Sequence, residues 1–177
     1  FSQAAKKAIP TGWPQAKPAD PEPMPTPSVS PWEWWSPDQI AAAINCPVGA
    51  VERNWPRLVE QMTRAGIYDR FTAASMLATV AIETAHKFEP IHEFPDWQRY
   101  PNSGGYPPHY DGGADYHGRG FIQNTHKYNY ASLGPKIAEF WGAGESDPTF
   151  DLVANPDNLL DPDMSAAAAA IICKSVN

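Results

Sequence analysis

The segment from Phe71 to Phe88 restricts the fold more than any other part of the sequence. Apolar residues recur in it at alternating steps of three and four, which is the spacing of one face of an α-helix. We therefore predict a helix here, with a core-facing stripe formed by Phe71, Ala74, Ala78, Ala81, Ala85 and Phe88.

Glu83 lies on the side of this predicted helix that is opposite the stripe. Its neighbours one and two turns back are Thr79, Val80 and Met76, so this second face is also largely apolar. A carboxyl group in such surroundings is costly to ionise, and we expect its pKa to be raised. A raised carboxyl pKa suits a general acid that works near neutral pH. The alternative is a surface glutamate paired with Lys87, four residues further on.

The composition excludes several classes of function. A chain of 177 residues with 42% hydrophobic content can form one sizeable core, so one folded domain is expected. The net charge of −7 argues against nonspecific binding to nucleic acid or to an anionic membrane surface, because both need a basic face. Cys46 and Cys173 are too few for a disulfide framework and are expected to be buried free thiols. The sequence shows neither a membrane-spanning run nor a signal-peptide pattern, and no membrane insertion is expected.

The chain divides at about residue 31. A proline occurs every two to four residues from Pro10 to Pro31, which is typical of an extended, semi-rigid linker. We interpret residues 1–31 as the end of a preceding domain plus this linker, and residues 32–177 as the catalytic domain. A docking ligand for an aromatic groove is the alternative for the Pro-rich part. The end at Asn177 leaves open whether the last helices of the domain are complete.

Start and stop signals place further helices around the Glu83 segment. Ser36, Pro37 and Asp38 form an N-cap, a first-position proline and an acidic first turn. We favour a hydrophobic seal over a sugar-stacking platform for the three tryptophans just before this cap, Trp32, Trp34 and Trp35. The predicted helices are 39–45, 48–66 divided at Pro56, 125–133, 135–141 and an alanine-rich last helix from Pro162 to about Lys174.

A region rich in Pro, Gly and aromatic residues extends from Lys87 to Gly120 without a sustained period. So long a loop in a compact domain is usually either functional or disordered, and disordered segments are poor in aromatic residues. We expect it to contain at most a small hairpin and to line a groove that stacks on sugar rings. Its aromatic residues are Phe94, Trp97, Tyr100, Tyr106, Tyr110 and Tyr116.

Five blocks of the sequence together resemble glycoside hydrolase family 19, which comprises chitinases and many phage endolysins. The match runs in order from about Ala73 to Ala170, and within the family the chain looks most like the central domain of a mycobacteriophage lysin A. The resemblance implies a mainly α fold, α+β and lysozyme-like, with the loop region lining a substrate groove. The blocks are Thr79–His86 (TVAIETAH), Pro90–Glu93 (PIHE), Gly118–Thr125 (GRGFIQNT), Tyr128–Tyr130 (YNY) and Asn155–Asp157 (NPD).

The resemblance implies an endolysin glycosidase that degrades peptidoglycan. Such an enzyme hydrolyses β-1,4 bonds between N-acetylated amino sugars with two carboxyl groups and inversion at the anomeric carbon. It implies a monomeric domain of a longer multidomain lysin, which binds peptidoglycan glycan strands and needs no metal or organic cofactor. The protein would be made in the host cytoplasm and would act on the cell wall after release.

The resemblance also assigns catalytic roles. Glu83 matches the general acid and Glu93 the general base that activates water. Glu89 is the rival base, although its short spacing from Glu83 leaves little room for a water between carboxyls that need to be roughly 6.5–9.5 Å apart. Thr125 matches the hydroxyl residue that positions this water, and it also suits the N-cap of the following helix.

Five further residues are expected at the substrate site. Gln123 and Asn129 match sugar-binding amides, whose carbonyl and NH2 groups can hold hydroxyl and N-acetyl groups together. Arg119 is expected to act structurally or electrostatically, for instance on a catalytic carboxylate. Tyr116 and His86 complete the predicted substrate-binding set.

Three alternatives remain open at the level of sequence. The first is a zinc amidase or peptidase, although the spacing of the histidines fits no H-E-x-x-H pattern. The second is a lytic transglycosylase, which needs a single acidic residue and gives an anhydro product. The third is a non-catalytic module that binds the cell wall. The residues that raise the zinc alternative are His86, His92, His109, His117 and His126, with Asp111 and Asp115 nearby.

Overall fold

The computed structural model describes residues 29–93, 110–144 and 147–176, and within them the chain is mainly helical, as predicted. The predicted linker up to residue 28 and the aromatic residues Phe94, Trp97, Tyr100 and Tyr106 lie outside the described residues. The helices are α1 (Pro37–Ile44), α2 (Val48–Ala65), α3 (Arg70–Glu83), α4 (Lys127–Trp141) and α5 (Pro162–Val176). The short elements are strands β1 (Ile91–His92) and β2 (Arg119–Gly120) and the 3-10 helices η2 (Ala114–Tyr116), η3 (Pro148–Phe150) and η4 (Pro156–Leu160).

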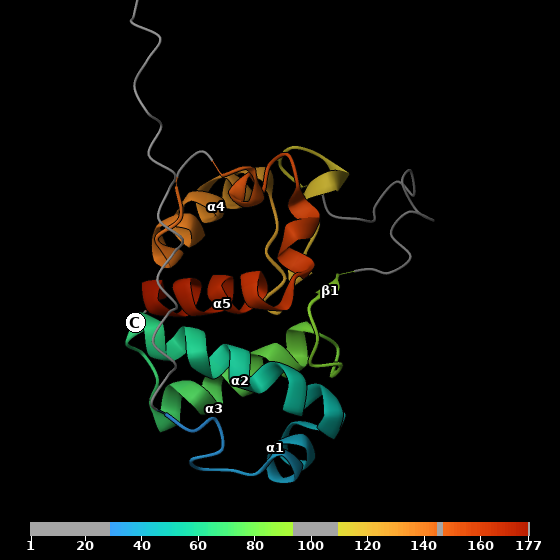
Figure 1. Ribbon diagram of the computed structural model, residues 1–177. Coiled ribbons are helices and arrows are strands. Elements are labelled where there is room, and N and C mark those ends of the chain that lie inside the picture. The colour runs from blue at the N-terminus through green and yellow to red at the C-terminus, as the bar shows by residue number, and fades with distance from the viewer. Residues whose placement is uncertain (1–28, 94–109, 145–146, 177) are drawn as a thin grey trace, which may run out of the picture.

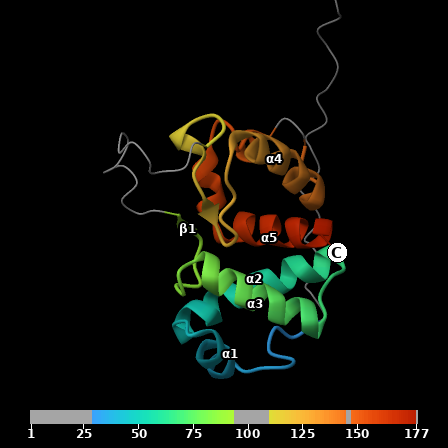
Figure 2. The same ribbon diagram turned by 180° about the vertical axis from the view of Figure 1, so that it is seen from behind.

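Helix α5 lies between the group formed by α1, α2 and α3 and the region that contains α4 (Figures 1 and 2). All five alanines from Ala166 to Ala170 are buried, because both sides of the helix are covered. Ala166, Ala169 and Ala170 belong to the hydrophobic cluster with α1, α2 and α3. Ala167 and Ala168 belong to a second cluster, with α4. A helix surface of methyl groups lets both neighbouring groups approach closely.

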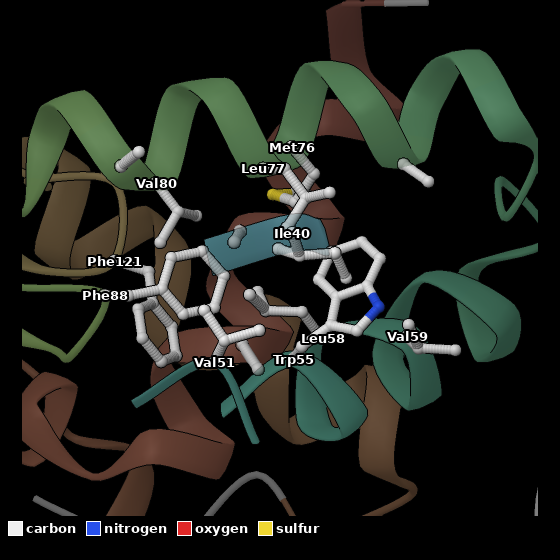
Figure 3. Packing of buried hydrophobic residues seen from close by; sticks show 14 of the residues in the cluster. Ile40, Val51, Trp55, Leu58, Val59, Met76, Leu77, Val80, Phe88 and Phe121 are labelled. Carbon is white, nitrogen blue, oxygen red and sulfur yellow. The ribbon is translucent and has the colours of Figure 1, made fainter. Parts of the chain in front are cut away.

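The first cluster is built on α2, whose Val51, Trp55 and Leu58 are fully buried (Figure 3). The three tryptophans before α1 pack against this cluster from outside, which confirms their role as a hydrophobic seal. Trp34 stacks on Tyr68 with ring centroids 4.8 Å apart. The indole N–H of Trp55 donates to the backbone carbonyl of residue 31 at 2.8 Å, which attaches the entering chain to the core.

The predicted core-facing stripe of α3 is wrong at four of its six positions, and only Ala81 and Phe88 are buried as expected. Phe71 is 85% exposed, and the predicted positions 74, 78 and 85 are exposed as well. The helix instead buries a face that contains its larger apolar side chains, and Figure 3 shows three of them pointing into the core. A Met, Leu or Val side chain removes more apolar surface from water than an alanine does, so these residues decide which face is buried. The buried residues are Ala73, Met76, Leu77, Val80 and Ala81.

Helix α3 also ends five residues earlier than predicted, at Glu83. The hydroxyl of Thr84 donates to Val80 O at 2.6 Å and accepts from the Phe88 N–H at 3.0 Å. These bonds turn the chain, so that Phe88 enters the core from outside the helix with a positive φ of 55°. Glu83 therefore lies at the C-terminal end of the helix, next to a sharp turn.

Two prolines that were predicted to divide helices do not do so. Pro56 lies inside α2 and Pro135 inside α4, and both helices continue through them. Buried residues flank each proline, Trp55 and Leu58 in α2 and Leu133 and Ile137 in α4, so tertiary packing holds the two halves in line. The predicted starts of the first and last helices are confirmed, and Ser36 and Gln39 form a reciprocal capping box at α1.

Strands β1 and β2 pair antiparallel, with Ile91 opposite Gly120 and His92 opposite Arg119. This agrees with the small strand pair expected in the loop region. The backbone N–H of Phe121 donates to Ser165 Oγ at 2.7 Å and so attaches β2 to α5. A Cβ at Gly120 would lie 2.7 Å from the same Ser165 Oγ, so β2 can approach α5 this closely only with glycine there.

Cys46 is a buried free thiol, as predicted, whereas Cys173 is partly exposed, which differs from the burial expected for it. Among the described helices, none combines the length and the apolar character that crossing a membrane would require.

Candidate active site

The Glu93 carboxylate lies directly after β1 and is held by the chain that leads into β2. Its Oε2 accepts a hydrogen bond from the Gly118 N–H at 3.0 Å and another from the Tyr110 hydroxyl. The backbone N–H of Glu93 donates to Gly118 O at 2.8 Å. These contacts fix the position of a half-buried carboxylate.

Gly118 leaves room for two functional side chains. A Cβ at this position would lie 2.9 Å from Glu93 Oε2 and 2.8 Å from Gln123 Oε1, which is closer than real Cβ atoms approach. Gly118 is the first glycine of the Gly-Arg-Gly block. Its lack of a side chain lets the Glu93 carboxylate and the Gln123 amide come together.

The Glu83 side chain is exposed at the end of α3. Partial desolvation raises its pKa, and the negative charge of Glu93 raises it further. The direction of the shift agrees with the sequence prediction, but the surroundings differ, because Met76 and Val80 point into the core and do not cover Glu83.

A pocket of about 630 Å³ lies between α3, α5 and the chain from Ile122 to Thr125. Three of the predicted residues, Gln123, Thr125 and Asn129, line it together. Neither Glu83 nor Glu93 lines it, but Glu93 lies beside Gln123, and Thr79 of the lining is one turn before Glu83 on α3. None of the described side chains that line it is charged; they are Phe71, Thr72, Ser75, Met76, Thr79, Ile122, Gln123, Asn124, Thr125, Asn129, Ala169, Ile172 and Cys173.

Gln123 connects the pocket to the strand pair. Its Nε2 donates to Ile91 O at 3.1 Å and to Gly120 O at 2.8 Å, so both amide hydrogens are used to hold β1 and β2. Its Oε1 is buried and has no hydrogen-bond partner among the described residues. The amide therefore presents one unused acceptor near Glu93.

Thr125 is half-buried and is not the N-cap of α4, so this alternative for the residue is wrong. The helix begins two residues later, at Lys127, and His126 occupies the cap position without a side-chain cap bond. The Thr125 carbonyl accepts from Asn129 Nδ2 at 2.8 Å. The Thr125 hydroxyl is therefore not used to cap α4. One amide hydrogen of Asn129 is used in a hydrogen bond within the protein.

Arg119 and Tyr116 hold the structure around β2. Arg119 is only 5% exposed; its Nε donates to Asp157 Oδ1 at 2.6 Å, and its Nη1 donates to Asp115 O at 2.7 Å and to the Tyr130 hydroxyl at 3.1 Å. Tyr116 is buried, donates to Val153 O at 3.1 Å and packs edge-on against Tyr130. Both are part of the frame around β2, and the carboxylate partner of Arg119 is Asp157.

The structure gives His86 and Glu89 contacts with α1 and α2. His86 is exposed, and its Nδ1 lies 2.9 Å from Ile44 O at the end of α1. Glu89 forms an ion pair with Arg53 of α2 and lines a different pocket, together with Arg57 and Pro162. The turn after α3 therefore directs these two side chains towards α1 and α2.

Comparisons with protein-family models, with curated proteins and with solved structures find no match. The family resemblance of the five sequence blocks stays a hypothesis, and the geometry of the described residues must carry the functional argument.

The contact between His92 of β1 and His117, which precedes β2, was not predicted. His92 Nδ1 lies 2.8 Å from His117 Nε2, and His117 Nδ1 lies 3.0 Å from Ala114 O. Since Ala114 O can only accept, His117 carries its proton on Nδ1 and accepts from His92 at Nε2. Burial lowers the pKa of both rings, and the Arg119 charge lowers them further. The described residues contain no group of three His, Cys, Asp or Glu side chains arranged to hold a metal ion.

Proposed function

We propose that this protein is a glycoside hydrolase that cleaves β-1,4 bonds between N-acetylated amino sugars of peptidoglycan. The observation that carries the proposal is the position of Glu93 beside Gln123, which lines an uncharged pocket together with Thr125 and Asn129; the charge of Glu93 also contributes to the raised pKa of Glu83. An inverting glycosidase needs such a pair, with one member protonated and the other ionised. The mainly helical chain with a small strand pair is compatible with the lysozyme-like fold that the resemblance implies.

Glu83 is the general acid of the proposed reaction. Its raised pKa keeps its proton available at higher pH, and its exposed position at the end of α3 lets it reach a glycosidic oxygen. As the bond between the anomeric carbon and this oxygen breaks, the Glu83 proton passes to the leaving sugar. The electron-deficient sugar carbon is then attacked by water from the opposite face.

Glu93 is the general base. One of its carboxylate oxygens is held by Gly118 N–H and the Tyr110 hydroxyl, which leaves the other oxygen to accept a proton from the attacking water. We assign to the Thr125 hydroxyl the positioning of this water. Glu89 is less suited to the role, because its carboxylate already forms an ion pair with Arg53.

The setting in the cell follows from this activity. An enzyme that hydrolyses peptidoglycan must reach the cell wall, and the sequence resemblance to endolysins suggests synthesis in the cytoplasm of an infected host and release before action. Its partner is the glycan strand. The mechanism uses only side chains of this chain.

Mass spectrometry of the soluble products released from purified peptidoglycan tests the proposal. We expect new reducing ends from the wild-type protein and a loss of about 10²–10⁴ in rate in the Glu83→Gln variant, the range typical of a lost general acid. Glu52→Gln, a change of an exposed glutamate on α2, serves as the matched control and should act as wild type.

The products also discriminate among the alternatives. Anhydro ends, together with full activity of Glu93→Gln, would identify a lytic transglycosylase, which needs only one acidic residue. Freed peptides would identify an amidase or peptidase. Wild-type protein that binds the wall but releases no products would contradict the hydrolase assignment.

A further inference from the structure

His126 has a backbone conformation that is unfavourable for a residue with a side chain, and the proposed reaction does not use its ring. Its φ is 68° and its ψ is 134°, a combination that glycine adopts far more readily. The side chain does not cap α4, although His126 occupies the cap position. Backbone strain of this kind persists where surrounding contacts hold the residue in place, often at functional sites. The contacts of the His126 ring are therefore informative.

The His126 ring holds the chain around Tyr110 in two ways. Its Nδ1 accepts a hydrogen bond from the Asp111 N–H at 3.1 Å, so the neutral ring carries its proton on Nε2. The ring also lies edge-to-face with the Tyr110 ring, with centroids 5.6 Å apart. The backbone adds a third link, from Lys127 N to Asp111 O at 2.9 Å. The start of α4 thus holds both Tyr110 and the residue that follows it.

Tyr110 in turn holds the proposed base. It is buried, and its hydroxyl donates to Glu93 Oε2, the same oxygen that accepts from the Gly118 N–H. Because this hydroxyl is attached to a rigid ring, any displacement of the Tyr110 ring also displaces the hydroxyl. A catalytic group keeps its working geometry only when the residues that hold it are themselves fixed by packing and hydrogen bonds. The contacts of His126 provide this for Tyr110.

We propose that His126 is a positioning residue of the proposed active site, which acts on Glu93 through Tyr110. The acceptor at His126 Nδ1 and the edge of the ring contact fix Tyr110, and the Tyr110 hydroxyl fixes one oxygen of the base. The inference rests on the proposed function in that Glu93 is the general base. Its structural part, the control of the Tyr110–Glu93 hydrogen bond by His126, does not depend on turnover.

Reducing-end assays at saturating substrate test the role of His126 in catalysis. His126→Gly removes the ring and suits the positive φ, so it deletes the contacts without adding backbone strain. We expect kcat to fall about tenfold, because a small displacement of a catalytic group lowers the rate. Asn45→Gly is the matched control and should act as wild type, since Asn45 is an exposed residue with positive φ at the end of α1.

His126→Asn tests whether the hydrogen bond to Asp111 matters. Asparagine tolerates a positive φ better than most residues, and its amide oxygen lies one bond beyond Cγ, where histidine has Nδ1. This variant should therefore recover part of the rate that His126→Gly loses. Equal kcat values of the two variants would show that the acceptor does not position Tyr110 and would overturn the proposal.

A double-variant cycle separates action through Tyr110 from any other role. Tyr110→Phe removes the hydroxyl that holds Glu93. In this background His126→Gly should lower kcat by less than about twofold, because the effects of residues that act as one unit are not additive. Losses that multiply, or full activity of His126→Gly alone, would overturn the proposal.

Carbon-13 NMR of the Glu93 carboxyl carbon tests the structural part without substrate, with Glu93→Gln to assign the resonance. Tyr110→Phe and His126→Gly should shift this resonance in the same direction, because both weaken the hydrogen bond to Oε2. A resonance that moves in Tyr110→Phe but not in His126→Gly would overturn the inference. Failure of the wild-type protein to form reducing ends would contradict the proposed hydrolysis, and the NMR result would still decide whether His126 holds Tyr110 against Glu93.

Discussion

Glu93 and Gly118 are joined by two hydrogen bonds, one from Glu93 N to Gly118 O at 2.8 Å and one from Gly118 N to Glu93 Oε2 at 3.0 Å. The first is a backbone hydrogen bond directly after the β1–β2 pair, and it extends this pair by one bond. The second joins the Gly118 N–H to the Glu93 carboxylate itself. The position of the proposed base is therefore fixed by the backbone of a residue 25 positions further along the chain.

Gly118→Ala should lower activity with little loss of stability. The new methyl group would collide with Glu93 Oε2 and Gln123 Oε1, and the carboxylate would have to move. Since a misplacement of 1 Å can cost about 10²-fold in rate, we expect kcat to fall by roughly ten- to a hundredfold. Reducing-end assays at saturating substrate measure this. Gly144→Ala is the control, because a Cβ there meets nothing within 4 Å. A fully active Gly118→Ala enzyme would argue against Glu93 as the base.

The Glu83 pKa should fall when the Glu93 charge is removed. Because the folded pKa of Glu83 is raised in part by that charge, the Glu93→Gln variant should release the Glu83 proton at lower pH. Carbon-13 NMR titration of the Glu83 carboxyl carbon in both proteins measures the change. Glu89→Gln should leave the titration unaltered, since the Glu89 carboxylate is paired with Arg53. In the active enzyme, the rate should decline as pH rises through the raised pKa, because the acid loses its proton.

The His92–His117 pair should make the protein less stable in mild acid. Both rings have pKa values lowered by burial and by Arg119, while the charge of Asp157 opposes the shift. A lowered folded pKa means that the unfolded chain binds protons first, so stability is present above the unfolded pKa of about 6.5 and is lost as pH falls below it. Urea midpoints at pH 7.5 and pH 5 should therefore differ. His92→Gln should reduce this difference, and the exposed His86→Gln should preserve it; equal pH dependence in all three proteins would contradict the prediction.

Removing Arg119 should be far more damaging than removing Arg53. Arg119 is buried and holds a carboxylate, a hydroxyl and two carbonyl groups, so Arg119→Met should lower the free energy of unfolding by about 3–5 kcal/mol. The Arg53–Glu89 ion pair is exposed to solvent, and Arg53→Met should cost only about 0–1 kcal/mol. Chemical denaturation of the two variants checks this. Similar losses would mean that Arg119 does not hold the frame around β2.

The starts of α1 and α5 were more predictable from the sequence than the buried face of α3. The Ser36 cap and the Pro162 start depend on local chemistry, which sequence signals record directly. The core side of α3 was misassigned because its alanines repeat with helical spacing, while the larger Met76 and Leu77 decide which side is buried. The raised pKa of Glu83 was predicted in direction, yet part of its cause, the charge of Glu93, depends on the tertiary structure.

Pairs that are distant in sequence could not be predicted. His92 and His117 are 25 residues apart and meet only because β1 pairs with β2. Asn124 stands in the middle of a recognisable block, but only the packed structure shows that its Nδ2 has no partner among the described residues. A sequence reports which groups are present, whereas the satisfaction of each group depends on the neighbours that folding brings.

The alanine run of α5 has a consequence for the reaction that the catalytic residues alone do not reveal. On one side it packs against the group of helices that carries Glu83, and its Ser165 holds the chain next to Gly118 and therefore Glu93. Helix α5 supplies neither carboxyl group, yet its packing helps to hold the chain that precedes α4 against the group of helices that contains α3. Replacing one of its buried methyl groups with a larger side chain would overpack this contact, so such a change would disturb the proposed site without altering either carboxyl group.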